Sequence, residues 1–447
     1  MRSKTLGLFC WALYDWANSA FPTVIQTFVF AQYFGTAVVA EPISAQSQWG
    51  KMVSLAALVV AIGGPVLGAA ADKGGRRKAW IAVFMLVCVI ATAMLWWVKP
   101  EPGYAFLALC LVGIATIGTE FANIFYNAML PTLASPQQMG RWSGWGWSFG
   151  YAGGLCCLLV ALFGFVDNNA WFGIEPIQAR NVRATFVLVS VWYLAFSIPL
   201  LLLTPADRGT PIRVGRAVRE GVGQLCQSIK QIRAYAHIIR FLIARMIYTD
   251  GLVTVFVFGG IYAATTLGME MEKVLMFGIA MNVTAGLGAA GFAWIDDYIG
   301  SKRTILLSLA SLALLSTLMV MVGSEQWQKL FGADDQAMQL LGGEWTRSQF
   351  WFAIIGLVFG IFVGPAQAAS RSYMAKAAPR ELRNQMFGLY AFSGKATAFL
   401  GPLLVGVITE WSRNPRAGIS VVVAFFIIGL GMMLTVPDLT VEEKYRV

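Results

Sequence analysis

The chain has 447 residues, of which 57% are hydrophobic and 13% charged, and its mean hydropathy is +0.65. Charged residues make up about 25% of ordinary soluble domains, so these values exclude a soluble protein and indicate one that crosses a membrane many times. The formal net charge of +10 at pH 7 comes from Lys and Arg in short loops between apolar segments rather than on one continuous face. We therefore expect no nucleic-acid partner.

A membrane-spanning helix needs about 20 mostly apolar residues, and twelve segments of the chain meet that condition. They fall near 6–34, 48–71, 79–98, 104–130, 141–166, 184–203, 239–267, 273–295, 303–323, 350–374, 385–410 and 417–436. Lys and Arg are more frequent on one side of these segments, which is the cytoplasmic side by the positive-inside rule. Twelve spans then predict that both termini are cytoplasmic.

Two of the spans carry a polar stripe on an otherwise apolar helix. In the first span the stripe consists of Asp15, Asn18 or Ser19, Pro22 and Gln26. In the fourth span it consists of Thr116, Glu120, Asn123 and Asn127, at steps of four, three and four. Each set falls on one helical face. Because ionisable side chains inside a span are costly and usually face a cavity or a partner, we interpret the stripes as walls of a shared cavity.

A short charged motif occurs in two loops that lie half the chain apart. The second span is followed by Asp72, Arg76 and Arg77, and the eighth span, 225 positions later, by Asp297, Lys302 and Arg303. An Asp that closes one helix can bond to Lys or Arg that open the next, and such a cluster can form in one conformation and part in another. One copy alone would be an ordinary charged turn. Two copies predict an internal repeat of six-span halves, as in many secondary transporters.

The longest cytoplasmic connection separates these halves. We expect six-helix domains at 1–203 and 239–447, joined by a linker at 204–238. Apolar residues of the linker recur at steps of three and four from Val218 to Ile232, which predicts either an amphipathic helix on the membrane surface or a solvated helix. The predicted fold class is an all-α membrane protein with twelve transmembrane helices in two pseudo-symmetric six-helix bundles.

Several longer strings resemble a known family. They are Trp11-Ala-Leu-Tyr-Asp-Trp-Ala-Asn-Ser-Ala in the first span, Tyr248-Thr-Asp-Gly in the seventh, Gln367-Ala-Ala-Ser-Arg-Ser in the tenth and Phe387-Gly-Leu-Tyr-Ala-Phe-Ser-Gly-Lys in the eleventh. With the loop motif, they resemble the vacuole-effluxer branch of the major facilitator superfamily. The resemblance implies a fold whose first, fourth, seventh and tenth helices line a central pathway. It also implies the efflux of small metabolites, which are amino acids in the fungal vacuole.

The stripes and the resemblance together select two groups of candidate residues. The substrate and coupling candidates are Asp15, Asn18, Gln26, Asn123, Arg245, Tyr248, Asp250, Gln367 and Lys395. The gate candidates are Asp72, Arg76, Arg77, Glu120, Asp297, Lys302, Arg303 and Arg371. At a rise of 1.5 Å per residue, Asp15, Asp250 and Lys395 lie roughly 15 Å from their cytoplasmic span ends, whereas Glu120 and Arg371 lie nearer the cytoplasmic mouth.

The midplane carboxylates allow two interpretations. Asp15 or Asp250 can take up a proton when desolvated and pair with a cation when the cavity opens, which would couple transport to protons. The alternative is a permanent ion pair that holds the structure together, such as Arg245 with Asp250 or Asp15 with Lys395.

These observations predict a secondary active transporter that exports a small polar solute by alternating access, with an amino acid or a related metabolite as the solute. The sequence lacks the residues of the common catalytic sites, because it has a single histidine, no Gly-x-Ser-x-Gly elbow and no phosphate-binding loop. We therefore do not expect an enzyme. The alternatives are a lipid or amphiphile translocase and a non-transporting membrane sensor. We expect a monomer in the lipid bilayer of the bacterial cytoplasmic (inner) membrane, a small-molecule substrate, and no cofactor or metal.

Overall fold

A computed structural model describes residues 2–39, 41–74, 76–167, 169–205, 235–331, 338–340 and 343–438. Within these residues, ten helices are long and apolar enough to cross a membrane, and Leu400–Ser412 is a shorter apolar helix. The prediction of an all-α, multi-pass membrane protein is confirmed. The linker helix predicted within 204–238 falls mainly outside the described residues.

Contacts divide the chain into two compact units. The first unit comprises Met1–Ala234 and Met374–Lys395, and the second comprises Tyr235–Tyr373 and Ala396–Val447. The repeat in the sequence suggested a single boundary, in the linker. The contacts instead attach the segment from Met374 to Lys395, which includes the start of the predicted eleventh span, to the first unit.

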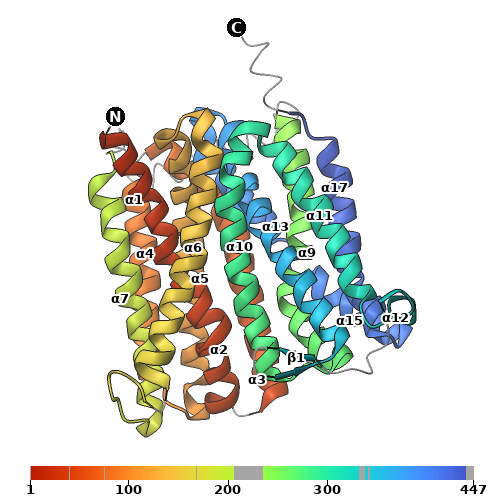
Figure 1. Ribbon diagram of the computed structural model, residues 1–447. Helices are drawn as coiled ribbons and strands as arrows, with labels where there is room; N and C mark the ends of the chain where they lie inside the picture. Colours follow the sequence, from red (N-terminus) through yellow and green to blue (C-terminus); the bar gives the residue numbers. More distant parts are fainter. Residues whose placement is uncertain are drawn as a thin grey trace. The chain divides into compact units, whose positions relative to one another are not determined.

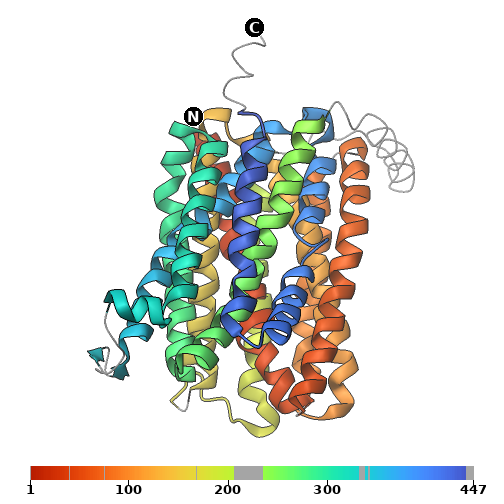
Figure 2. The same ribbon diagram turned by 90° about the vertical axis from the view of Figure 1, so that its right-hand side faces the viewer.

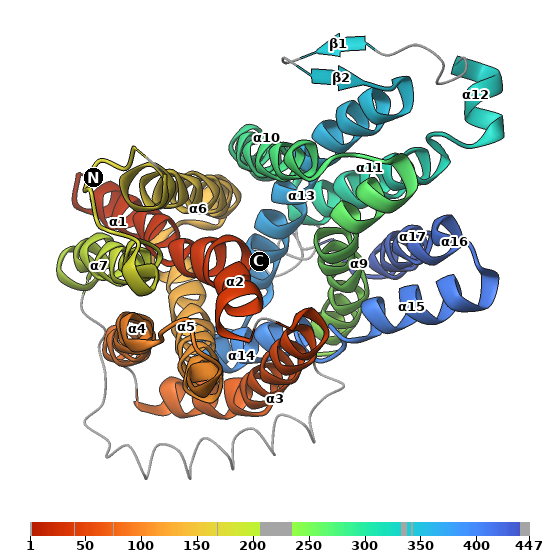
Figure 3. The same cartoon turned by 90° about the horizontal axis from the view of Figure 1, so that it is seen from below.

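The first unit is a bundle of long helices (Figure 1). Its helices are α1 (Arg2–Asn18), η1 (Phe21–Phe28), α2 (Phe30–Tyr33), η2 (Phe34–Val38), α3 (Pro42–Gly74), α4 (Arg77–Met94), α5 (Ala105–Leu133), α6 (Met139–Ala161), η6 (Leu162–Val166), α7 (Arg180–Leu203) and α14 (Arg383–Ser393). Short turns of 3₁₀-helix lie at Leu95–Trp97, Pro102–Tyr104, Pro136–Gln138, Ile177–Ala179 and Arg380–Leu382. Helix α5 contacts α1, α3, α4, α6 and α14 and is the centre of the bundle, as the end-on view shows (Figure 3).

The first span lies where it was predicted but is not a regular α-helix. Its middle, η1, and its end, η2, are π-helical, with the Val29 amide bonded to the Val24 carbonyl (2.8 Å) and the Val39 amide to the Phe34 carbonyl (3.0 Å). Short π-helical insertions are frequent at functional sites, because they rotate the side chains that follow them. Gln26 lies inside η1.

The second unit contains the remaining elements. They are α9 (Ala236–Leu267), α10 (Met271–Ile299), α11 (Ser301–Met321), α12 (Glu325–Phe331), the antiparallel strands β1 (Met338–Leu340) and β2 (Gly343–Trp345), α13 (Arg347–Ala377), α15 (Leu400–Ser412), α16 (Pro415–Ile419) and α17 (Val421–Leu434). The end of α13 belongs by its contacts to the first unit. Helices α9 and α17 run side by side (Figure 2), because Gly429 of α17 leaves room for Tyr248 of α9.

The eleventh span is broken, so the prediction of one continuous helix at 385–410 was wrong. Helix α14 ends at Ser393 and α15 begins at Leu400. Between them, backbone hydrogen bonds reach only to the third preceding residue, as from Lys395 N to Phe392 O (3.0 Å) and from Leu400 N to Thr397 O (2.7 Å). Pro402 contributes to the end of the break, because a proline has no amide hydrogen and its ring clashes with the carbonyl four residues earlier, that of Ala398.

Glycines permit the close approach of α3 and α14. A Cβ atom added to Gly68 would lie 2.9 Å from Cα of Gln385, and one added to Gly388 would lie 2.8 Å from Cα of Pro65. Real Cβ atoms do not come so close to backbone atoms. A larger residue at Gly68 or Gly388 would therefore force α3 and α14 apart.

We expect Gly68→Ala to lower the free energy of unfolding by about 2 kcal/mol, because overpacking against backbone cannot be relieved by a rotamer change. Thermal unfolding of the purified protein measures the effect. Gly278→Ala in α10 is the matched control, since nothing lies within 4 Å of its added Cβ, and it should leave stability unchanged or raise it slightly. Equal stability of the two variants would contradict the prediction.

Candidate functional site

The polar stripes of the first and fourth spans face each other in the first unit. Asn18 of α1 donates from Nδ2 to Oδ1 of Asn123 in α5 (2.9 Å), and Gln26 of η1 donates from Nε2 to Oγ1 of Thr116 in α5 (2.8 Å). Asn18 is buried, while Gln26 and Asn123 are half-buried. Two hydrogen bonds between neutral groups therefore connect the stripes.

An ion pair lies on the same face of α5. The ammonium of Lys395, in the break of the eleventh span, lies 2.8 Å from Oε1 of Glu120, and the two side chains are 36% and 23% exposed. Lys395 was expected at the bilayer midplane and Glu120 near the cytoplasmic mouth. That separation was wrong, because Glu120 lies 13 positions before the end of α5 at Leu133 and Lys395 lies 12 positions after the start of α14 at Arg383, so a rise of about 1.5 Å per residue puts both at a similar depth.

Asp15 and Ser19, both of the predicted first-span stripe, lie against Gly150 of α6. Asp15 is buried, and its Cβ lies 3.6 Å from a Cβ added to Gly150 of α6. The suggested ion pair between Asp15 and Lys395 is therefore not formed, since Lys395 binds Glu120. Of the first-span candidates, Asn18 and Gln26 face α5, and Asp15 packs against α6.

The candidates of the seventh and tenth spans lie in the second unit. Tyr248 of α9 and Ser370 of α13 share a hydrogen bond (Oη to Oγ, 2.6 Å). Arg245 and Arg371 are buried, and Gln367 is half-buried. Ser370 was not a candidate, although its place between Gln367 and Arg371 in the family string was a usable signal.

Asp250 is the most buried carboxylate among the candidates. Only 2% of the residue is exposed, and Oδ1 has no hydrogen-bond partner among the described residues. The suggested ion pair between Arg245 and Asp250 is likewise not formed within them.

In the first loop motif, Asp72 does not form the expected contact with Arg76 or Arg77. Oδ1 of Asp72 accepts hydrogen bonds from the backbone amide (3.0 Å) and the side-chain amide (2.7 Å) of Asn384, and Oδ2 accepts one from the backbone amide of Gln385 (2.8 Å). These amides open α14, so Asp72 caps that helix from α3 and also complements its dipole.

Basic residues surround this cap. Burial, followed by the neighbouring guanidinium groups of Arg77 and Arg380, lowers the pKa of Arg383 to about 10. Arg383 therefore still carries its charge at neutral pH, but in a cluster of like charges at the start of α14. Arg77 takes part as one of these charges and not as the direct partner of Asp72.

The second loop motif also has other partners than those expected. Arg303 lies 3.3 Å from the carboxylate of Asp438, and Lys302 donates to the carbonyl of Leu434 (3.2 Å). The buried carboxylate of this region is Asp296, which accepts from the hydroxyls of Ser301 (2.6 Å) and Ser372 (2.5 Å). The sequence offered Asp296 and Asp297 side by side, and the prediction chose the second.

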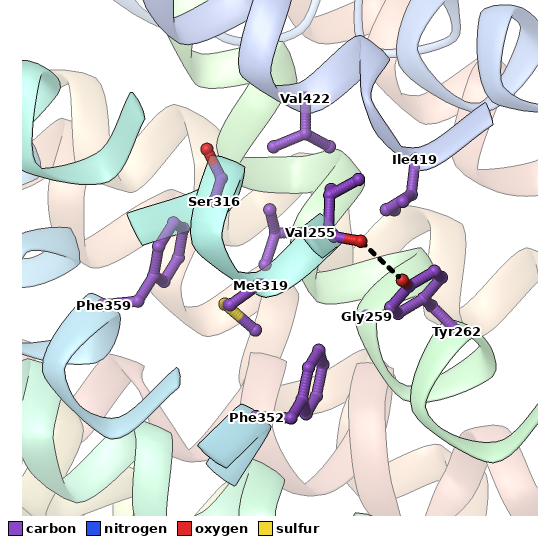
Figure 4. Close-up of a pocket in the computed structure, with 10 residues that line it drawn as sticks. Val255, Gly259, Tyr262, Ser316, Met319, Phe352, Phe359, Ile419 and Val422 are labelled. Carbon is purple, nitrogen blue, oxygen red and sulfur yellow. Dashed lines mark hydrogen bonds between the residues drawn. The ribbon is translucent and has the colours of Figure 1, made fainter. Parts of the chain in front are cut away.

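The second unit also contains a small apolar cavity (Figure 4). Val255, Met319 and Phe359 are among the residues that line it, and Tyr262 closes one side by donating to the carbonyl of Val320 (3.3 Å). No lining residue is charged. The cavity therefore lacks groups for binding a polar solute and is separate from every candidate residue above.

Comparison with known proteins adds the family. The model of vacuole effluxer Atg22-like proteins matches residues 34–141 and 137–440. The chain belongs to the vacuole effluxer Atg22-like family. This Atg22-like protein is 25% identical over 433 residues to the MFS-type transporter YxiO of Bacillus subtilis, covering 96% of this chain and 94% of the relative. It is also 25% identical to autophagy-related protein 22 of Kluyveromyces lactis, covering 83% of this chain and 74% of the relative.

Solved structures show the fold of this Atg22-like protein. The proton:xylose symporter XylE superposes with a TM-score of 0.74 at 14% identity, over 98% of this chain and 96% of that chain. A bacterial homologue of the iron transporter ferroportin, in its outward-facing state, superposes with a TM-score of 0.67 at 13% identity, over 97% and 99%. These structures show the major facilitator fold, and the family and the B. subtilis relative show a membrane transporter rather than an enzyme.

Proposed function

We propose that the protein is a secondary active transporter that exports a zwitterionic amino acid or a related small polar metabolite by alternating access. The observation that supports this best is the Glu120–Lys395 ion pair, with the ammonium and carboxylate 2.8 Å apart and both side chains partly exposed. On the same helix, the Asn18–Asn123 and Gln26–Thr116 hydrogen bonds supply neutral donors and acceptors. Together these groups form a compact polar surface within the first unit.

The chemistry of the pair favours a solute that carries both charges. A zwitterion can take the place of both members of the pair. Its carboxylate replaces Glu120 as the partner of Lys395, and its ammonium replaces Lys395 as the partner of Glu120. A solute with one charge would leave the other member of the pair unmatched in a partly desolvated place, which is costly. Two more contacts, from Asn123 and Gln26, then orient the side chain of the solute.

Alternating access also needs a contact that opens and closes. We assign this role to the contact between α3 and α14, in which Asp72 caps the start of α14 and glycines allow the backbones to meet. Hydrogen bonds to a helix end can be replaced by water without breaking a helix, so the contact can form and part at moderate cost. The Asp296–Ser301–Ser372 cluster and the pairs made by Lys302 and Arg303 have the corresponding place in the second motif.

The relatives and the charge pattern support the proposed location. The family is described as one of vacuole effluxers, a name that states release of solute from the vacuole, and export from the cytoplasm is our proposal. The B. subtilis relative supports a place in a bacterial cytoplasmic membrane, and the distribution of Lys and Arg supports cytoplasmic termini.

Counterflow in proteoliposomes tests the proposal. Vesicles that contain the purified protein and an excess of the twenty unlabelled proteinogenic amino acids should accumulate the same amino acids labelled with ¹⁴C, at least about tenfold above protein-free vesicles. Exchange requires a carrier, so a membrane sensor would bind without exchange. Putrescine and succinate, which carry one sign of charge, are the control solutes and should not exchange. Exchange of these controls but not of amino acids would contradict a zwitterion site.

A further inference from the structure

Asp250 lies in the middle of α9, within the second unit, in surroundings that do not satisfy its carboxylate. The residue is 2% exposed, and Oδ1 is buried without a hydrogen-bond partner among the described residues. Transfer of an ionised carboxylate into such a place costs several kcal/mol or more, and an isolated carboxylic acid avoids the cost by taking up a proton. A site of this kind inside a span is a functional candidate by default.

A second unsatisfied oxygen lies beside it. Thr397 is next to the Asp250 carboxylate, and its hydroxyl oxygen is also buried without a partner among the described residues. Thr254, one turn along α9, does not fill this role, because its hydroxyl donates to the backbone carbonyl of Asp250 (2.6 Å). The two groups can therefore be joined in either of two ways, by the Thr397 hydroxyl donating to an ionised carboxylate or by a protonated carboxyl group donating to the hydroxyl oxygen.

The break in the eleventh span brings Thr397 to Asp250. Thr397 lies in the turn between α14 and α15, where the backbone leaves the helical pattern. Helix α15 then packs closely on α9, because a Cβ added to Gly401 would lie 3.4 Å from the backbone oxygen of Asp250. In secondary transporters, discontinuous helices of this kind lie at substrate and ion sites, since unwound backbone is tolerated in a membrane only where protein or a cavity surrounds it.

We propose that Asp250 and Thr397 form a proton-binding site, in which the protonated carboxyl group of Asp250 donates its hydrogen to Oγ1 of Thr397. The proton comes from water on one side of the membrane and returns to water on the other. A proton fits better than a metal cation, because only two unsatisfied side-chain oxygens meet here. No charged side chain of the described residues forms an ion pair with Asp250, and its Oδ1 is buried without a hydrogen-bond partner among them.

Thr397 connects the proton site to the proposed solute site through the backbone, because it lies two residues after Lys395. Lys395, two residues earlier, belongs to the first unit and holds Glu120, whereas Thr397 belongs to the second unit. The six residues from Gly394 to Phe399 are outside any regular helix. Loss of the proton reverses the hydrogen bond, because the Thr397 hydroxyl then donates to the carboxylate, and the turn that also carries Lys395 can adjust to this change. This step rests on the proposed function, because it couples the proton to the zwitterion site.

Infrared spectroscopy of the purified protein in lipid tests the site without any solute. A protonated carboxylic acid has a carbonyl stretch that is separate from the bands of carboxylates. We expect this band in the wild type at neutral pH and its loss in Asp250→Asn, which keeps the shape of the side chain. Asp15→Asn is the matched control, because Asp15 is also a buried carboxylate of a span, and it should keep the band. A band that persists in Asp250→Asn, or that disappears in Asp15→Asn instead, would overturn the proposal.

Two further variants test the role of Thr397. Thr397→Val removes the acceptor and should shift the carbonyl band to higher frequency, whereas Thr397→Ser keeps the hydroxyl and should restore the wild-type position. An identical band in all three proteins would show that Thr397 does not hold the proton. Gel filtration and thermal unfolding establish that each variant is folded before its spectrum is interpreted.

A transport measurement separates this site from the proposed function. Uptake of the ¹⁴C-labelled amino acid mixture into proteoliposomes is measured twice. The first measurement uses an imposed pH gradient, and the second uses counterflow without a gradient. In Asp250→Asn the ratio of gradient-driven transport to counterflow should fall at least about tenfold. A ratio equal to that of the wild type, or one that depends on a Na⁺ gradient, would overturn proton coupling at this site. If the wild type shows no counterflow of amino acids, the proposed substrate is wrong, and the infrared result still decides the proton site.

Discussion

Replacement of Asp72 by Ala is expected to lower the free energy of unfolding by roughly 2 kcal/mol, the combined effect of losing a helix cap and hydrogen bonds to a charged acceptor. Three donors from Asn384 and Gln385 lose their acceptor at once. Two of these are backbone amides at the first turn of α14, which has no other cap side chain in the described residues. Thermal unfolding in detergent measures the loss.

The design of the control follows from the geometry of the cap. Asp72→Asn keeps one side-chain oxygen as an acceptor and should lose about half as much stability. Glu101→Ala removes an exposed carboxylate that caps no helix with its side chain, so its stability should stay within about 0.5 kcal/mol of the wild type. If Asp72→Ala unfolds at the same temperature as Glu101→Ala, the capping role is wrong.

The sequence predicted the spans and their polar faces well, because both depend on local patterns. Hydrophobic length alone located the helices, and spacing at three and four residues selected the faces on which Asn18 meets Asn123 and Gln26 meets Thr116. The family strings likewise predicted the fold that the solved structures show. These inferences need only the identity of residues within a few helical turns of one another.

The partners of charged residues were predicted poorly, because they depend on contacts between distant segments. Asp72 was recognisable as a residue that could cap a helix, but its donors lie more than 300 positions further along the chain. The choice between Asp296 and Asp297 depended on which side of α10 faces Ser372 in α13. Neither fact can be derived from one sequence without a contact map.

The eleventh span was predicted as one helix, and the break in it is also of functional interest. Glu120 and Lys395 were assigned to different depths, although they lie 13 and 12 positions from the predicted cytoplasmic ends of α5 and α14. The first part of the span is held in the first unit by Asp72 and Glu120, and the part from Ala396 onwards packs in the second. One predicted span thus has two sets of contacts, and the turn between them is where solute binding and proton binding can influence each other.

Breaking the Glu120–Lys395 pair is expected to have the larger effect on transport. Glu120→Gln and Lys395→Met each leave one charge without its partner and without the matching group of a zwitterion, so counterflow of the labelled amino acids should fall at least about tenfold in either variant. Stability should change by only about 1 kcal/mol, because both side chains are partly exposed. Glu270→Gln is the matched control, since Glu270 lies 3.7 Å from Lys273 in a pair whose acid is 75% exposed, and it should transport normally.

Exchange of the two charges separates a binding role from a structural one. The double variant with Glu120→Lys and Lys395→Glu can form the same ion pair, so its stability should return towards that of the wild type. Its counterflow should stay low, because the carboxylate and ammonium of the solute would then meet their binding groups in reversed positions relative to Asn123 and Gln26. Recovery of both stability and counterflow would show that the pair only holds α5 to the eleventh span. Recovery of stability alone is the result that places the pair in contact with the solute.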